Sequence, residues 1–152
     1  MTKVGFYIID TAETDSRLRL ALRLSDKAFC RGHRVYLFCY SEAQARELVE
    51  RLWTFRPSSF LPHSIAPLIP GEQEGQLSER EAPISLGWTQ EPGTHNDLLI
   101  NLRGEIPQFF SRFKRVAELV NQAPQRLQAL RDSYRIYRAR GYPLEQHNLA
   151  SV

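Results

Sequence analysis

The 152-residue sequence lacks the features that would place a protein in a membrane or outside the cell. No apolar run approaches the roughly 18 residues of a membrane-spanning helix. The first apolar stretch, residues 4–9, is too short for the apolar region of a signal peptide and has no small-residue cleavage site behind it. Two cysteines, Cys30 and Cys39, are too few for a disulfide framework or a zinc site. We therefore expect a cytoplasmic protein without membrane contacts.

Motifs for nucleotide binding and for common catalytic sites are also missing. Where a phosphate-binding protein would carry a glycine-rich turn after its first strand, residues 10–15 contain three carboxylates and no glycine. No GxxxxGK[ST] or GxSxG sequence occurs, and none of the four histidines is paired at metal-ligand spacing. Asp97, which opens a predicted strand, is better explained as a strand-end cap than as a metal ligand. We expect no catalytic residue, metal or cofactor.

Alternating strand-like and helix-like patterns predict an α/β fold. Short apolar runs predict strands over residues 4–10, 33–40, 64–68, 83–88, 97–102 and 115–120. Helical spacing of apolar residues and helix-end signals predict helices over residues 14–31, 42–53, 107–113 and 124–140. This alternation is typical of right-handed crossovers between parallel strands. We expect one domain over residues 1–152, a Rossmann-like, mostly parallel sheet flanked by helices, without a nucleotide-binding motif.

The last predicted helix combines an apolar stripe with a basic edge. The stripe, expected to face the sheet, consists of Leu127, Leu130, Tyr134 and Tyr137. The basic edge beside it consists of Arg131, Arg135 and Arg138. An arginine fork next to an apolar hole suits a carboxylate attached to an apolar side chain. The same charges would suit a nucleic-acid phosphate or form a plain solvated helix face, and charge alone does not separate these readings.

A second candidate binding feature is the segment 52–63, which follows a predicted helix end. It contains one tryptophan, two phenylalanines and two prolines within twelve residues. These side chains could pack as a core cluster at one end of the sheet. Rigid aromatic side chains in a proline-stiffened loop are also what protein interfaces use as anchors, because they lose little entropy on binding.

Taken in order, several segments resemble the chi-subunit family of bacterial DNA polymerase III, over nearly the whole chain. These segments are Phe6-Tyr7-Ile8-Ile9-Asp10, Leu52-Trp53 with Arg56-Pro57, Ser59-Phe60 and Pro62-His63, Pro83-Ile84 with Trp88, residues 97–102, and Arg131, Tyr134-Arg135, Tyr137-Arg138 and Gly141-Tyr142. The resemblance implies a nucleotide-binding-like fold without nucleotide. It also implies a non-catalytic subunit that links the clamp-loader complex to the acidic C-terminal tail of single-stranded-DNA-binding protein, so that DNA is contacted indirectly.

The resemblance also implies two sets of interface residues. The pocket for the tail would comprise Arg131, Tyr134, Arg135 and Val120, with Arg131 at the terminal carboxylate and Arg135 at the upstream acids. A lysine expected one turn before Arg131 is replaced by Leu127, and the neighbouring Arg126 is the candidate to compensate. The face for the psi subunit would comprise Trp53, Pro57, Phe60 and Leu61. A repair helicase is a further candidate partner for that face.

The rival hypothesis is a module that binds nucleic acid directly through the basic last helix. The net charge of +3 is modest for such a protein. The helix also offers no ladder of aromatic residues on which bases could stack. We therefore favour the protein-binding hypothesis and keep direct binding of nucleic acid as the alternative.

Overall fold

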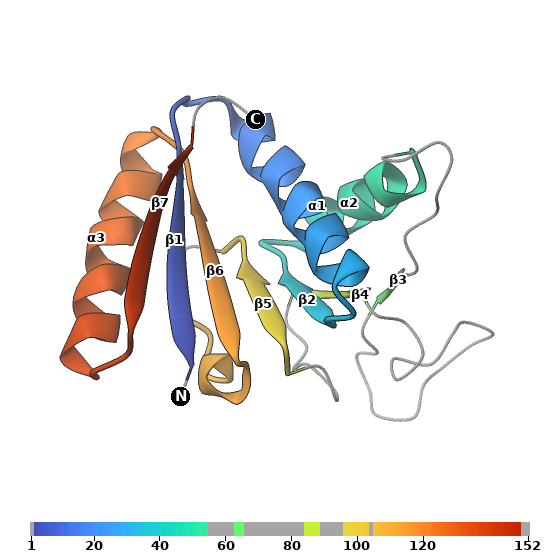
Figure 1. Cartoon of the computed structure of the whole chain (residues 1–152). Helices are drawn as coiled ribbons and strands as arrows, with labels where there is room; N and C mark the ends of the chain where they lie inside the picture. The colour runs from blue at the N-terminus through green and yellow to red at the C-terminus, as the bar shows by residue number, and fades with distance from the viewer. Residues whose placement is uncertain (1, 55–62, 66–83, 89–95, 104, 150–152) are drawn as a thin grey trace.

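The computed structural model describes residues 2–54, 63–65, 84–88, 96–103 and 105–149. Within these residues seven strands form one sheet, and every pair of neighbouring strands is parallel (Figure 1). The strands are β1 (Lys3–Ile9), β2 (Val35–Phe38), β3 (His63–Ile65), β4 (Ile84–Gly87), β5 (Leu98–Asn101), β6 (Arg115–Val120) and β7 (Leu144–Leu149). Their order across the sheet is β3-β4-β2-β5-β6-β1-β7. The predicted parallel α/β fold is confirmed.

Helices cover both faces of this sheet. They are α1 (Thr14–Cys30), α2 (Glu42–Thr54), α3 (Pro124–Ala139) and the 3-10 helix η1 (Phe110–Arg112). Successive strand residues point to opposite faces, so each central strand contributes to two cores. In β2, for example, Val35 and Leu37 pack with α1 and α2, whereas Tyr36 and Phe38 pack on the face that carries Tyr137 of α3. The sheet therefore lies between an α1/α2 layer and an α3 layer.

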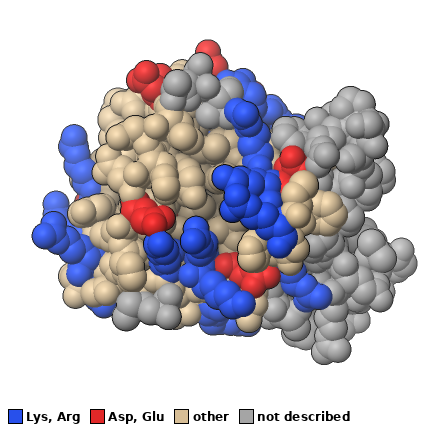
Figure 2. All heavy atoms as spheres, viewed as in Figure 1, with Lys and Arg blue, Asp and Glu red and all other residues tan. Residues whose placement is uncertain are grey.

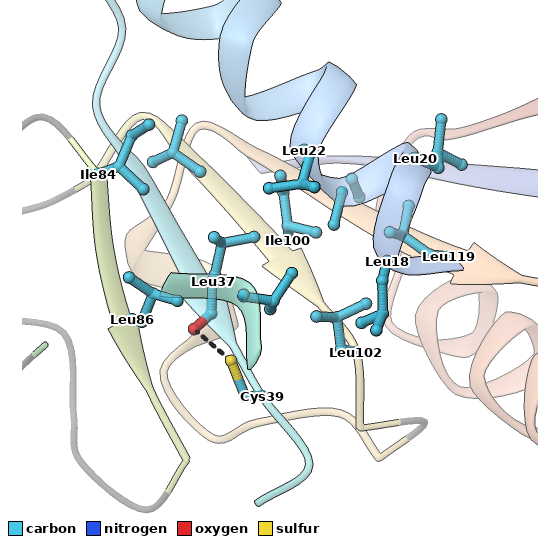
Figure 3. Close-up of a cluster of buried hydrophobic side chains, with 14 of the residues drawn as sticks. Leu18, Leu20, Leu22, Leu37, Cys39, Ile84, Leu86, Ile100, Leu102 and Leu119 are labelled. Atoms are coloured by element: carbon cyan, nitrogen blue, oxygen red, sulfur yellow. Dashed lines mark hydrogen bonds between the residues drawn. The ribbon is translucent and has the colours of Figure 1, made fainter. Parts of the chain in front are cut away.

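The core under α1 and α2 is aliphatic (Figure 3). Leu22 of α1 lies beside Ile100 of β5, and Leu18 of α1 lies near Leu102, which follows that strand. Cys39 is completely buried there, and its thiol donates to the carbonyl oxygen of Leu37 at 3.6 Å. Burial raises the pKa of this thiol to about 12. Cys39 is thus a core residue.

The sequence analysis does not predict β7, because its last predicted strand is the one over residues 115–120. β7 lies at the edge of the sheet and pairs with β1 alone among the described strands. Its sequence, LEQHNL, alternates poorly between apolar and polar residues because most of its side chains are partly or fully exposed. An edge strand of this kind has no apolar pattern from which it could be predicted.

Smaller differences concern boundaries. The helix predicted over residues 107–113 is the three-residue η1, and the strand predicted over residues 64–68 begins at His63 and is described only to Ile65. None of the helices in the described ranges is long and apolar enough to cross a bilayer.

Candidate functional site

A side chain of α1 lies at the carboxyl ends of β5 and β6, the edge of the sheet at which Rossmann-like proteins bind nucleotides. Arg17 of α1 is 3% exposed, and its guanidinium donates to the carbonyl oxygens of Leu119 at 3.1 Å and Leu102 at 2.6 Å. Burial, and then the nearby charge of Arg126, lower the pKa of Arg17 to about 10. Arg17 thus joins α1 to the carboxyl ends of β5 and β6.

Two of the three carboxylates in the acidic turn after β1 pair with arginines of the same chain. Asp15 forms ion pairs with Arg19 and Arg51, and Glu13 pairs with Arg19 at 3.3 Å. Side-chain hydrogen bonding to Arg51 is the main cause that holds the pKa of Asp15 below its usual value. Among the described residues, no group of three or more histidine, cysteine or acidic side chains could hold a metal ion. This turn is therefore a structural link between α1 and α2.

Asp97 acts as the strand-end cap that its position predicts. Its Oδ2 accepts a hydrogen bond from the backbone N–H of Arg34 at 2.8 Å. Its Oδ1 lies 3.4 Å from Nζ of Lys114. Asp97 therefore joins the entry to β2 and the entry to β6 on either side of β5.

On the other face of the sheet, α3 presents two different sides. Tyr137 is fully buried and Ser133 is 6% exposed, so this side packs on the sheet. The side chain of Tyr134, expected in the stripe facing the sheet, is 38% exposed. Its ring still lies 5.6 Å, centre to centre, from the buried ring of Phe6. Tyr134 thus stands at the border between the core and the solvent.

A groove of about 630 Å³ lies along this border, between α3 and β7. It is lined by Leu130, Arg131, Tyr134, Arg135, Arg138 and Ala139 of α3 and by Gln146 of β7. Residues at positions i, i+3, i+4 and i+7 of a helix share one face, which explains why the arginines meet here. The groove brings together Arg131, Tyr134 and Arg135, three of the residues predicted to bind the tail.

The arginines of this groove form no close ion pair with the residues that the structure describes. Within the described part of the chain, no carboxylate lies within 4 Å of the guanidinium groups of Arg131, Arg135 or Arg138. Figure 2 shows basic side chains projecting from the side of the molecule that α3 forms in Figure 1. A concave surface with apolar lining and three cations that no described carboxylate pairs is suited to an anionic ligand that carries an apolar group.

The other two residues of the predicted pocket, Val120 and Arg126, lie beside this groove. They line a separate hollow of about 10 Å³ that shares only Leu130 with the groove. Val120 is 5% exposed, and Arg126 donates to the carbonyl oxygen of Arg103 at 3.4 Å. A hollow of this size holds about one water molecule, so no ligand side chain fits in it in this arrangement.

Sequence reasoning missed a buried carboxylate beneath α3. Glu118 of β6 is 4% exposed, and its Oε1 accepts a hydrogen bond from the Tyr137 hydroxyl at 2.9 Å. The amide of Asn101 donates to both of its carboxylate oxygens, at 3.0 and 3.1 Å. Burial raises the pKa of Glu118 to about 7, although both donors and Arg17 act against the shift. A lone glutamate within the apolar run of β6 was the signal that could have revealed it.

The predicted psi-binding residues give no site geometry. Trp53 belongs to α2, but its side chain lies outside the described residues, as do Pro57, Phe60 and Leu61.

The sequence is similar to known proteins over its whole length. Residues 1–145 match the family model described as "DNA polymerase III chi subunit, HolC". A protein of Pseudomonas aeruginosa named DNA polymerase III subunit chi is 47% identical over 152 residues, which cover 100% of both chains. Proteins of the same name from Haemophilus influenzae and Escherichia coli are 31% and 30% identical, over 95% of this chain and 95% and 96% of theirs.

Proposed function

We propose that this chain, which belongs to the DNA polymerase III chi-subunit family, links the polymerase to single-stranded-DNA-binding protein. As a member of that family it is a non-catalytic accessory subunit of DNA polymerase III. In the proposal, the groove between α3 and β7 holds the C-terminal tail of single-stranded-DNA-binding protein. The observation that carries it is the set of three arginines that lines this groove and forms no ion pair with an acidic side chain of the described ranges.

The chemistry of the groove supports a peptide C-terminus as the ligand. Arg131 offers a planar fork that matches a carboxylate with two parallel hydrogen bonds. Leu130 and the exposed part of the Tyr134 ring provide apolar surface next to it for the last side chain. Arg135, one turn further along α3, would then meet acidic residues upstream in the tail.

The second part of the proposal concerns the opposite end of the link. The psi subunit would pair with the segment that contains Trp53, Pro57, Phe60 and Leu61, and a repair helicase is a further candidate for this segment. Support for this part comes from the family membership and from the aromatic and proline content of the segment. DNA itself would be contacted only through these partners.

The first test measures the affinity of a fluorescent peptide with the last ten or so residues of the cognate single-stranded-DNA-binding protein. We expect micromolar binding that weakens with salt, because exposed charges contribute to it. Arg131→Ala should weaken binding at least about tenfold, since it removes a charge-assisted pair. Arg23→Ala, which removes an exposed arginine of α1, is the matched control and should change little.

Direct binding of nucleic acid is the second candidate, because the same unpaired arginines would attract phosphates. Among the described residues, Tyr134 is the only exposed aromatic side chain of α3, so a ladder for stacking bases is missing there. Single-stranded DNA in place of the peptide separates the two functions. If the DNA bound and the peptide did not, the tail-binding function would be wrong and α3 would be a nucleic-acid surface.

A further inference from the structure

The groove between α3 and β7 is longer than a terminal residue requires. Arg131 and Arg138 lie seven positions apart, which is about 10 Å along the helix axis at 1.5 Å per residue. An extended peptide covers this distance with about three residues, at roughly 3.3 Å each. A ligand whose terminal carboxylate meets Arg131 therefore has upstream residues beside Arg138.

We propose that Arg138 and Gln146 form a subsite for an acidic side chain about three residues before the last residue of the ligand. This inference rests on the proposed tail-binding function and adds a rule of sequence specificity to it. The spacing between the terminal carboxylate and the acid is set by the helix, because both arginines lie on one face of α3.

The charges around Arg138 select an acid at this position. Its guanidinium has no carboxylate within 4 Å in the described ranges of the chain. The nearest acid along β7, Glu145, pairs with Lys3 at 2.7 Å and lies 3.5 Å from His147. Neighbouring strand residues point to opposite faces, so Glu145 belongs to the α1 face and leaves the groove uncompensated.

Gln146 supplies the wall opposite Arg138. It pairs in register with Phe6 of β1, and Phe6 packs against α3, so Gln146 lies on the α3 face of the sheet. Its side-chain Nε2 donates one N–H to Oδ1 of Asn148 at 3.3 Å. The second N–H and the amide oxygen remain for the backbone of an extended peptide. In this subsite Arg138 would bind the acidic side chain of the ligand. Gln146 would bind the main chain of the ligand beside that acid.

The test compares two ten-residue peptides that end in the same apolar residue with a free carboxylate. One has aspartate three residues before the last residue and the other has asparagine there, with no other acid within three residues. Arg138→Ala should weaken binding of the aspartate peptide about fivefold and that of the asparagine peptide less than about twofold, as for a partly exposed ion pair. Arg140→Ala, which removes an exposed arginine that does not line the groove, is the matched control and should affect both peptides equally.

The outcomes separate the subsite from the tail-binding function. Loss of binding in Arg131→Ala without any difference between the peptides in Arg138→Ala would overturn the subsite and keep the function. If neither peptide bound the wild-type chain, the function itself would fail. An equal preference for aspartate in the wild type and in Arg138→Ala would also refute the subsite. Both substitutions are on the surface, so thermal unfolding should show unchanged stability.

Discussion

Glu118 places a carboxyl group in the layer between the sheet and α3, where its only hydrogen-bond donors in the described structure are Tyr137 and Asn101. The Tyr137 hydroxyl gives α3 a polar anchor on β6, directly beneath the helix that carries the groove. A buried group of this kind is costly when charged, and the pKa of Glu118 accordingly rises from 4.5 to about 7. Its protonation should therefore couple pH to the stability of the α3 layer.

Glu118→Gln should remove a pH dependence of unfolding. Because the pKa is higher in the folded than in the unfolded chain, the folded state binds more protons between about pH 4.5 and 7. The free energy of unfolding of the wild type should thus fall across this interval and level off above it. The total loss relative to Glu118→Gln should be no more than about 3 kcal/mol.

Urea unfolding of both proteins at pH 5, 6, 7 and 8 measures this difference. The substitution keeps one oxygen that can accept from Tyr137, so the variant should still fold. If wild type and Glu118→Gln changed in parallel from pH 5 to pH 8, Glu118 would titrate normally and the coupling would be absent.

At the scale of elements, α3 was predictable and its partner in the groove was not. Pro124 at the helix start, the apolar spacing and Gly141 at the end predicted α3 within one residue. β7 carries no periodic apolar signal, since its α1 and α3 faces are both partly exposed. Gln146 lines the groove with Arg138 only because β7 lies beside β1 in the folded chain. The sequence prediction therefore missed Gln146 as a groove residue.

The same limit applies to the walls of the predicted pocket. Helical spacing alone places Arg131, Tyr134 and Arg135 on one face, and in the structure they line one groove. Whether Val120 and Arg126 join them depends on how α3 sits across β1 and β6. Such tertiary packing has no counterpart in local sequence, and the structure places these two residues in a neighbouring hollow.

The turn between α3 and β7 offers a prediction at this scale. Gly141 has φ +79°, and the bonds from Gly141 N–H to the Arg138 carbonyl and from Tyr142 N–H to the Tyr137 carbonyl close the helix end. A Cβ at Gly141 would meet nothing within 4 Å, so only the backbone conformation opposes a side chain. Gly141→Ala should cost about 1 kcal/mol of stability.

Gly32, which ends α1 at the same φ, provides the control. Gly32→Ala should cost a similar amount in thermal or urea unfolding but leave affinity for the tail peptide unchanged. Gly141→Ala should also lower the affinity for the tail peptide, because this turn sets the position of β7 against α3. Equal peptide affinity in the two variants would show that the turn does not shape the groove.

At the scale of the whole molecule, the sheet separates α2 from the groove along α3. α2, which includes Trp53, packs beside β3 and β4 at one edge, whereas α3 and β7 lie at the other (Figure 1). The strands β2, β5, β6 and β1 stand between these edges. This separation of α2 from the groove fits the proposal of a subunit that links two partners.

This separation predicts that the two interfaces can be removed one at a time. Trp53→Ala should weaken pairing with the psi subunit by about 2 kcal/mol or more, as expected for an aromatic anchor, and leave affinity for the tail peptide within about twofold. Arg131→Ala should do the reverse. Calorimetric titration of each variant with psi and with the peptide measures both affinities, and circular dichroism controls for folding.

Titration of the peptide into the preformed complex with psi then tests whether the sheet transmits anything between its edges. Coupling between sites is reciprocal, so any change in peptide affinity caused by psi must appear as an equal change in psi affinity caused by the peptide. Because neither proposed interface includes the central strands, we expect no such change beyond about twofold. A larger, reciprocal effect would mean that binding of one partner changes the conformation that the other partner binds. If folded Trp53→Ala lost affinity for both psi and the peptide, the two partners would share one surface.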